Sequence, residues 1–179
     1  MNYTLRKAEL ADIPVIEKLI DESAWGLAIN DYTKEQIEGA LKSAWGVDTQ
    51  LIKDNTYFAV ESETEFVGCG GWSYRETLFG NDREEGRSSN ELNPNKQAAK
   101  IRAFFVKPIY ARTGIASILM SECEKEAKAK GFARLELMAT LPGQRLYARH
   151  GFVASDSIDY ELSNNLSIKF VPMSKQIDA

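Results

Sequence analysis

The sequence predicts a mixed α/β fold, with one central sheet and helices packed against it. Two observations predict this class. Short strand-like segments alternate with amphipathic helical segments along the chain, and 179 residues amount to one domain at roughly 150 residues per domain. The sequence contains no internal repeat and no linker-like stretch. A single domain over residues 1–179 is therefore expected.

The expected elements run in the order strand, two helices, three strands, helix, strand, short helix and two strands. Strands are expected at residues 3–6, 57–60, 66–72, 101–106, 135–138, 152–162 and 166–173. Helices are expected to begin at Asp12 and to span residues 33–44, 114–130 and 142–150.

The first two helices are predicted from the residues at their N-terminal ends. Asp12 is suited to cap the first helix and Pro14 fits its first turn, and apolar residues then recur at helical spacing. A turn at residues 26–31 is expected to end that helix. Thr33 and Gln36 form a capping-box pattern that starts the second helix.

The middle of the chain predicts two paired strands followed by a long loop. Residues 62–65 join the strands, and Gly70-Gly71 indicates a bulge or a close backbone approach in the second strand. Residues 77–97 are polar and aperiodic, which predicts a flexible loop. In a compact domain such a loop is more often functional or mobile than inert.

Turn residues bound the later elements. Gly131 closes the long helix after a lysine-rich last turn, and Gly151 ends the short helix that follows. Asn164-Asn165 predicts the turn of a final hairpin. The exposed edge of that hairpin could pair across a homodimer.

The net charge of −4 is unevenly distributed along the chain. Residues 100–149 contain ten Lys and Arg against four Glu, a local charge of +6, so the remainder carries −10. An acidic protein with one basic block is a poor general nucleic-acid binder, because phosphate contacts need a broad basic face. The block suits one small polyanion, and a solvated helix face is the alternative interpretation.

Composition excludes several other classes of site. The single histidine, His150, cannot form a multi-histidine metal site, and no metal is expected. Cys69 and Cys123 are expected to be buried apolar side chains. No run reaches the ~18 apolar residues of a membrane span, and the N-terminus lacks a signal-peptide pattern. A cytoplasmic location without a membrane partner is therefore expected.

The turn into the helix at residues 114–130 is the first candidate for chemistry. Gly114 and the small Ala116 allow backbone amides at a helix N-terminus to approach an anion closely, and Arg112 could add a direct charge. The segment lacks the glycine and lysine spacing of a P-loop or a Rossmann motif. A purely structural turn is the alternative.

A second block, at residues 135–152, complements the first. Together the two blocks resemble the GNAT superfamily of N-acetyltransferases, which use acetyl-CoA. The matching residues occur in family order: Val106, Pro108 and Tyr110, then Arg112, Gly114, Ile115 and Ala116, then Leu146 and Tyr147, then Gly151 and Phe152. The expected order of strands and helices is also that of the family, so the resemblance covers nearly the whole chain.

The resemblance implies a mostly antiparallel sheet whose strands at 101–106 and 135–138 splay apart to admit coenzyme A. It implies a pantetheine arm on the main chain of Phe104, Phe105 and Val106. It also implies a pyrophosphate on the backbone amides of Arg112, Thr113, Gly114, Ile115, Ala116 and Ser117. The sequence departs from the family at Ala111 and Thr113, where phosphate-binding side chains are common, and has no asparagine after the strand at 135–138.

The resemblance further implies an acetyl transfer. A strand amide near Phe105 would polarise the thioester carbonyl, and Tyr147 would protonate the departing thiolate; a packed aromatic is the alternative for Tyr147. Glu136 is the first candidate for the general base, with Glu76, Asp82 or a water chain as alternatives.

Residues available to the acceptor amine are Trp25, Asp31, Tyr32, Trp72, Tyr74 and Arg75. Aromatic and acidic groups suit a cationic amine, whereas Arg75 suits a carboxylate. The expected function is acetyl transfer from acetyl-CoA to a primary amine by direct attack in a ternary complex, with a small molecule as the acceptor. A non-catalytic acyl-CoA sensor and an enzyme acting on a protein amine are the alternatives.

Overall fold

The computed structural model describes residues 2–83, 88–163 and 165–177. Residues 84–87 of the predicted loop and Asn164 of the predicted hairpin turn lie outside this part of the chain. Eight strands form one sheet in the order β1-β2-β3-β4-β5-β8-β6, and β7 also pairs with β8. The strands are β1 Thr4–Lys7, β2 Tyr57–Glu61, β3 Phe66–Ser73, β4 Ala99–Val106, β5 Arg134–Thr140, β6 Val153–Ala154, β7 Ile158–Glu161 and β8 Ser167–Gln176.

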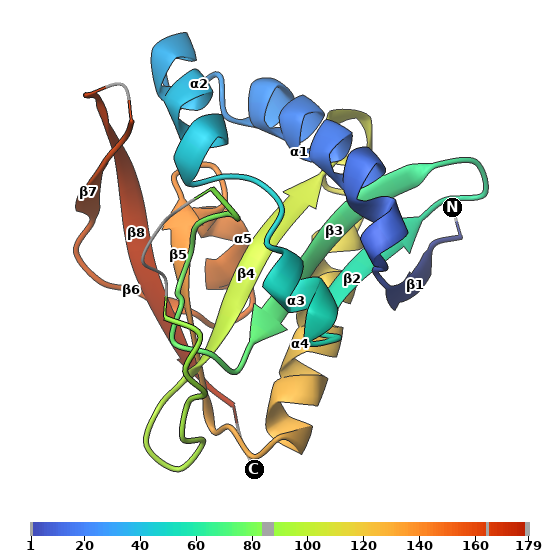
Figure 1. Ribbon diagram of the computed structural model, residues 1–179, viewed down its shortest axis with the longest axis vertical. Coiled ribbons are helices and arrows are strands. Elements are labelled where there is room, and N and C mark those ends of the chain that lie inside the picture. The colour runs from blue at the N-terminus through green and yellow to red at the C-terminus, as the bar shows by residue number, and fades with distance from the viewer. Residues whose placement is uncertain (1, 84–87, 164, 178–179) are drawn as a thin grey trace.

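Helices cover both faces of this sheet. Figure 1 shows α1, α2 and α3 in front of the sheet and α4 and α5 behind it. The helices are α1 Ile13–Leu27, α2 Lys34–Ser43, α3 Thr49–Lys53, α4 Ile115–Ala129 and α5 Gln144–Arg149, with 3-10 turns η1 Leu10–Asp12 and η2 Pro108–Tyr110. The predicted mixed α/β class and mostly antiparallel sheet are confirmed.

The sheet has one parallel pair, and that pair opens. Strands β4 and β5 are paired at Ala99 with Leu135 and at Lys100 with Glu136. Beyond these positions β4 continues to Val106 without a partner on that side, while β5 turns to pair with β8 along its whole length. The predicted splay is confirmed, and it leaves the far half of β4 with an open edge.

Apolar stripes hold the two helical layers on the sheet. Helix α4 buries Ile115, Leu119 and Cys123, and α1 buries Ile16 and Ile20. Both cysteines are buried and free, as expected. Burial of such apolar surface is the main stabilising contribution to the fold.

Helix α1 differs at both ends from the prediction. Asp12 occupies the N-cap position, but its side chain makes no cap hydrogen bond and instead accepts from Arg6, at 2.7 Å. The helix continues past Gly26 to Leu27 instead of turning at residue 26. Gly26 is needed there because a Cβ atom would lie 2.2 Å from Cγ of Pro108 in η2. By contrast, Thr33 and Gln36 form the predicted capping box of α2.

The described part of the 77–97 loop is tied to the sheet. The buried Arg102 donates to the carbonyls of Thr77, at 2.9 Å, and Gly80, at 3.0 Å. The amide of Asn81 donates to the carbonyl of Trp45, at 2.9 Å. This side of the loop is therefore positioned by buried polar contacts. No helix in the described ranges is long and apolar enough to cross a membrane.

Candidate active site

The separation of β4 from β5 produces a cleft that passes from one face of the sheet to the other. Its volume is about 1090 Å³. On the α4 side it is lined by Arg112, Gly114, Ile115, Ala116, Ser117, Gln144, Arg145, Leu146, Tyr147, Arg149 and His150. On the α1 side it is lined by Ser23, Ala24, Leu27, Ala28, Asp31, Trp45 and Phe79. Because both faces contribute, two ligands can meet in the gap from opposite sides.

The N-terminus of α4 forms an open cradle on the α4 side. Gly114 is the N-cap with φ of 95°, a left-handed conformation that favours glycine, and a Cβ atom at this position would have no other atom within 4 Å. The first intrahelical bonds to Gly114 come from the amides of Ser117 and Ile118. The amides of Ile115 and Ala116 therefore precede the helical bonding pattern and can bind an anion.

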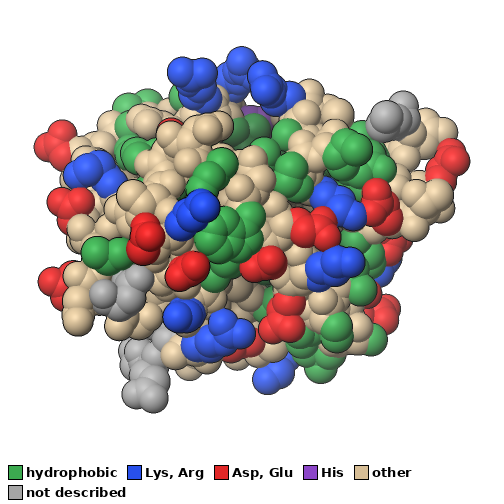
Figure 2. Space-filling view, turned by 90° about the horizontal axis from the view of Figure 1, so that it is seen from above, with side chains coloured by type: hydrophobic (Ala, Val, Ile, Leu, Met, Phe, Trp, Pro, Cys, Tyr) green, Lys and Arg blue, Asp and Glu red, His purple; other side chains and the backbone are tan. Residues whose placement is uncertain are grey.

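Basic side chains surround this cradle. Arg112 is joined by Arg145 and Arg149 of α5 and by His150, all lining the cleft. Nε2 of His150 lies 3.0 Å from Oγ of Ser117. Figure 2 shows Lys and Arg side chains gathered at the top of that view. Sequence reasoning placed His150 only at a helix end and missed the two α5 arginines, although the basic block contained them.

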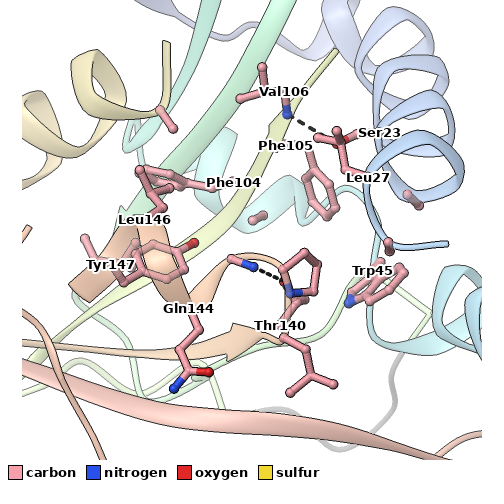
Figure 3. Close-up of a pocket in the computed structure, with 18 of the residues that line it drawn as sticks. Ser23, Leu27, Trp45, Phe104, Phe105, Val106, Thr140, Gln144, Leu146 and Tyr147 are labelled. Atoms are coloured by element: carbon pink, nitrogen blue, oxygen red, sulfur yellow. Dashed lines mark hydrogen bonds between the residues drawn. The ribbon is translucent and has the colours of Figure 1, made fainter. Parts of the chain in front are cut away.

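Tyr147 projects from α5 into the same space. Its ring packs between Phe104, at 6.2 Å, and Phe152, at 6.0 Å between ring centroids. Figure 3 shows its hydroxyl pointing toward the middle of the cavity. Burial, with a smaller contribution from the nearby Cys123, raises the pKa of Tyr147 well above the usual tyrosine value. The phenol is therefore protonated at neutral pH.

Strand β4 presents main-chain groups to the gap. The amide of Lys107 bonds the carbonyl of Val67 in β3, whereas the amide of Val106 donates to Oγ of Ser23, at 3.3 Å. Alternation along an antiparallel strand directs neighbouring residues to opposite sides, so the main chain of Val106 faces the gap. Ser23, which is 5% exposed, was missed by sequence reasoning because a serine inside a helix carries no signal.

A distortion of β4 lies beside this open edge. Ala103 has φ of 52°, and its carbonyl accepts a hydrogen bond from the hydroxyl of Tyr57, at 3.0 Å. The C=O and N–H of one trans peptide point in opposite directions. The N–H of Phe104 therefore points away from Tyr57, which packs with the α1 layer, and toward the face where the Phe104 ring meets Tyr147.

The α1 side of the cleft is mostly apolar. Trp45 is 6% exposed and packs against Tyr32, with ring centroids 5.8 Å apart. The hydroxyl of Tyr32 donates to the carbonyl of Lys169 and accepts from the amide of Leu141, each at 2.8 Å. Asp31 is exposed at the rim and is the one carboxylate among the described residues that line the cleft.

The structure does not bring every predicted site residue to the cleft. Glu136 forms an ion pair with Lys100 at the closed end of the β4–β5 pair, so its geometry does not support a role as base. Neither Glu76 nor Asp82 lines the cleft: Glu76 accepts from Ser88 and Asp82 from the amide of Thr49.

The acceptor residues predicted at the end of β3 and just after it also lie outside the cleft. Trp72 pairs with Ile101 beside the closed end and donates to Glu126, at 2.8 Å. Tyr74 packs against Lys130, and Arg75 is held by Asp54, at 2.6 Å. Because β3 runs antiparallel to β4, its last residues lie at the end of β4 that does not open.

Three further predicted residues are near the cleft without lining it. Trp25 packs in the α1–α2 core, and Tyr32 stands behind Trp45. Thr113 donates its hydroxyl to the carbonyl of Tyr110, at 2.7 Å, and accepts from Tyr3. The other predicted residues, Asp31, Phe104, Phe105, Val106, Arg112, Gly114, Ile115, Ala116, Ser117 and Tyr147, line the cleft.

The family model described as the Acetyltransferase (GNAT) family matches residues 21–152 of this chain. Among solved structures, a GCN5-related N-acetyltransferase from Rhodopseudomonas palustris is similar, with a TM-score of 0.72 and 19% identity, covering 99% of this chain and 97% of that one. The PaiA N-acetyltransferase from Thermoplasma acidophilum, in complex with coenzyme A, has a TM-score of 0.68 and 17% identity, covering 99% and 100%.

The ribosomal-protein-S18-alanine N-acetyltransferase from Escherichia coli is also similar, with a TM-score of 0.61 and 14% identity, covering 99% of this chain and 96% of that one. At these identities the likeness concerns the fold. No curated protein sequence matches the chain.

Proposed function

This chain belongs to the GNAT family and is an acetyl-CoA-dependent acyltransferase; we propose that it acetylates the primary amine of a small molecule by direct attack in a ternary complex. The observation that carries the proposal is the cleft through the sheet, which is basic on the α4 side and mostly apolar on the α1 side. We propose that the domain expected over residues 1–179 carries this activity as one unit.

The α4 side fits coenzyme A. We propose that the amides of Ile115 and Ala116 bind the pyrophosphate, with Gly114 leaving room for it. Arg145 and Arg149 would supply the phosphate-binding charges that Ala111 and Thr113 do not. The pantetheine arm would run along the open edge of β4 at Phe104–Val106, with its reactive end in the gap.

Acetyl-CoA supplies the acetyl group as a thioester, which amine attack converts to an amide and a free thiol. The N–H of Phe104, turned by the bond between Ala103 and Tyr57, would stabilise the charge that develops on the carbonyl oxygen. The hydroxyl of Tyr147 would donate its proton to the departing thiolate sulfur. In this sequence the C–N bond forms and the C–S bond breaks.

The amine must lose a proton before or during the attack. We propose that this proton leaves through water to Asp31 at the rim of the α1 side, in place of the predicted Glu136. Neither cysteine lines the cleft, and burial raises the pKa of Cys69 to about 12. An acetyl-cysteine route would need a thiolate in the cleft, so direct attack is the better-supported mechanism.

Thermal unfolding with and without acetyl-CoA, followed by thiol release against a panel of amines, tests this function. A ligand at 100 times its dissociation constant stabilises the folded state by about 2.7 kcal/mol, which gives a measurable rise in Tm. Thiol release with a small amine supports the proposal. A rise in Tm without release from any amine favours the sensor, and release with peptide amines alone favours a protein acceptor.

A further inference from the structure

The indole nitrogen of Trp45 is a buried donor without an acceptor. Among the side-chain atoms that the structure describes, Nε1 of Trp45 is the one buried polar atom with no hydrogen-bond partner. Buried polar groups in folded proteins are nearly always paired, because an unpaired donor loses its bonds to water and gains nothing. An unpaired N–H in a ligand cleft therefore indicates that a bound ligand, and not the protein chain, supplies its hydrogen-bond acceptor.

Trp45 is held in place with this nitrogen toward the cleft. Figure 3 shows the nitrogen on the side of the ring that faces the cavity, opposite Tyr147. Tyr32 packs on the indole and is itself fixed by two hydrogen bonds. The Trp45 carbonyl accepts from the buried Asn81. The donor is thus preorganised, which lowers the entropic cost of binding a ligand group.

The surroundings of this nitrogen select against a charged ligand group. The basic residues of the cleft other than Arg102 belong to the α4 side. The guanidinium of Arg102 is occupied by Asp48, at 2.8 Å, and by two carbonyl groups. A carboxylate beside Trp45 would exchange its hydration for one neutral donor in an apolar wall, which is unfavourable. A neutral oxygen needs no counter-charge.

We infer that Trp45 is a specificity-determining residue whose N–H binds a neutral oxygen of the acceptor, such as a carboxamide or ester carbonyl. This inference rests on the proposed function and narrows its substrate class to amines with an apolar body and a neutral hydrogen-bond acceptor. It excludes the amino-acid-like acceptor suggested by Arg75, which lies outside the cleft.

Three series of straight-chain primary amines test the inference: ω-amino carboxamides, their ω-amino carboxylate analogues and n-alkylamines of matching length. Binding to the complex with coenzyme A is measured by calorimetry, and turnover with acetyl-CoA by thiol release. For the wild type we expect the best carboxamide to bind roughly two- to tenfold more tightly than the matching alkylamine, the range of a net hydrogen bond. The carboxylate should bind worst.

Trp45→Phe keeps the aromatic packing and removes the N–H. It should abolish the preference for carboxamides and leave alkylamine binding and the Kd for acetyl-CoA unchanged. Trp25→Phe is the matched control, since Trp25 does not line the cleft, and it should retain the preference. If Trp45→Phe fails to fold, the comparison of the three series in the wild type still tests the preference for a neutral hydrogen-bond acceptor.

Two kinds of failure are distinguishable in this experiment. Equal binding of carboxamides and alkylamines, a preference for carboxylates, or no binding in any series overturns the inference. A carboxamide preference in binding that disappears in Trp45→Phe supports the inference even without thiol release, and in that case only the proposed acetyl transfer fails.

Discussion

At the scale of single residues, the hydroxyl of Tyr147 is the proposed general acid. Tyr147→Phe should lower kcat by about 100-fold, at the lower end of typical general-acid effects because a thiolate is a moderate leaving group. The Kd for acetyl-CoA should stay nearly unchanged, because the ring packing on Phe104 and Phe152 is retained. Single-turnover kinetics and calorimetry measure the two quantities, with Tyr74→Phe outside the cleft as the control.

The pH profile provides a second readout of the same assignment. Because burial raises the pKa of Tyr147, its protonated form persists to higher pH than in a free tyrosine, and activity is lost only as pH rises through the raised pKa. The wild-type kcat should therefore show no decline near the ordinary tyrosine pKa of about 10. A decline there, or an unchanged kcat in Tyr147→Phe, would remove the acid assignment.

Two substitutions at Gly114 test its backbone conformation and the proposed pyrophosphate site separately. Gly114→Ala places a side chain on a left-handed residue and should lower the free energy of unfolding by about 1 kcal/mol. Gly114→Glu adds bulk and negative charge where the phosphates would lie, so it should abolish the acetyl-CoA-induced rise in Tm. Undiminished affinity for acetyl-CoA in a folded Gly114→Glu protein would contradict the proposed pyrophosphate site at the N-terminus of α4.

At the scale of elements, α5 carries both the proposed general acid and the two arginines that we propose bind the cofactor phosphates. The double variant Arg145→Gln, Arg149→Gln should weaken acetyl-CoA binding by about tenfold at low salt, and the loss should shrink as salt rises because exposed charges are screened. Titrations at two ionic strengths measure this, and Lys128→Gln on the exposed face of α4 is the matched control. An affinity equal to wild type would show that backbone amides suffice.

The elements also show which local patterns could be predicted. Periodic helices with clear boundary residues, such as α2 with its Thr33 capping box and α4 with Gly131 behind it, were predicted closely. Helix α3 was missed because its five residues are too few to display a helical period. The end of α1 was misjudged because Gly26 serves a tertiary contact with Pro108, which no local pattern reveals.

At the scale of the whole molecule, predicting the site residues required knowing which end of the β4–β5 pair opens. Gly114 could be located from its motif, and Tyr147 follows once that motif is assigned. Trp45 and Ser23 could not be located, because they reach the cleft from a separate helical layer. Trp72 and Glu136 were misplaced because residue type alone does not distinguish the open end of β4 from the closed end.

The cleft through the sheet also has a consequence for the order in which ligands bind and leave. The cleft is lined from α4 and α5 on one side of the sheet and from α1 and Trp45 on the other. Under the proposed function each ligand would therefore enter from its own side, and neither would block the other. Under the proposed mechanism, coenzyme A would be able to leave before or after the acetylated product. In inhibition experiments, coenzyme A should therefore compete with acetyl-CoA and not with the amine.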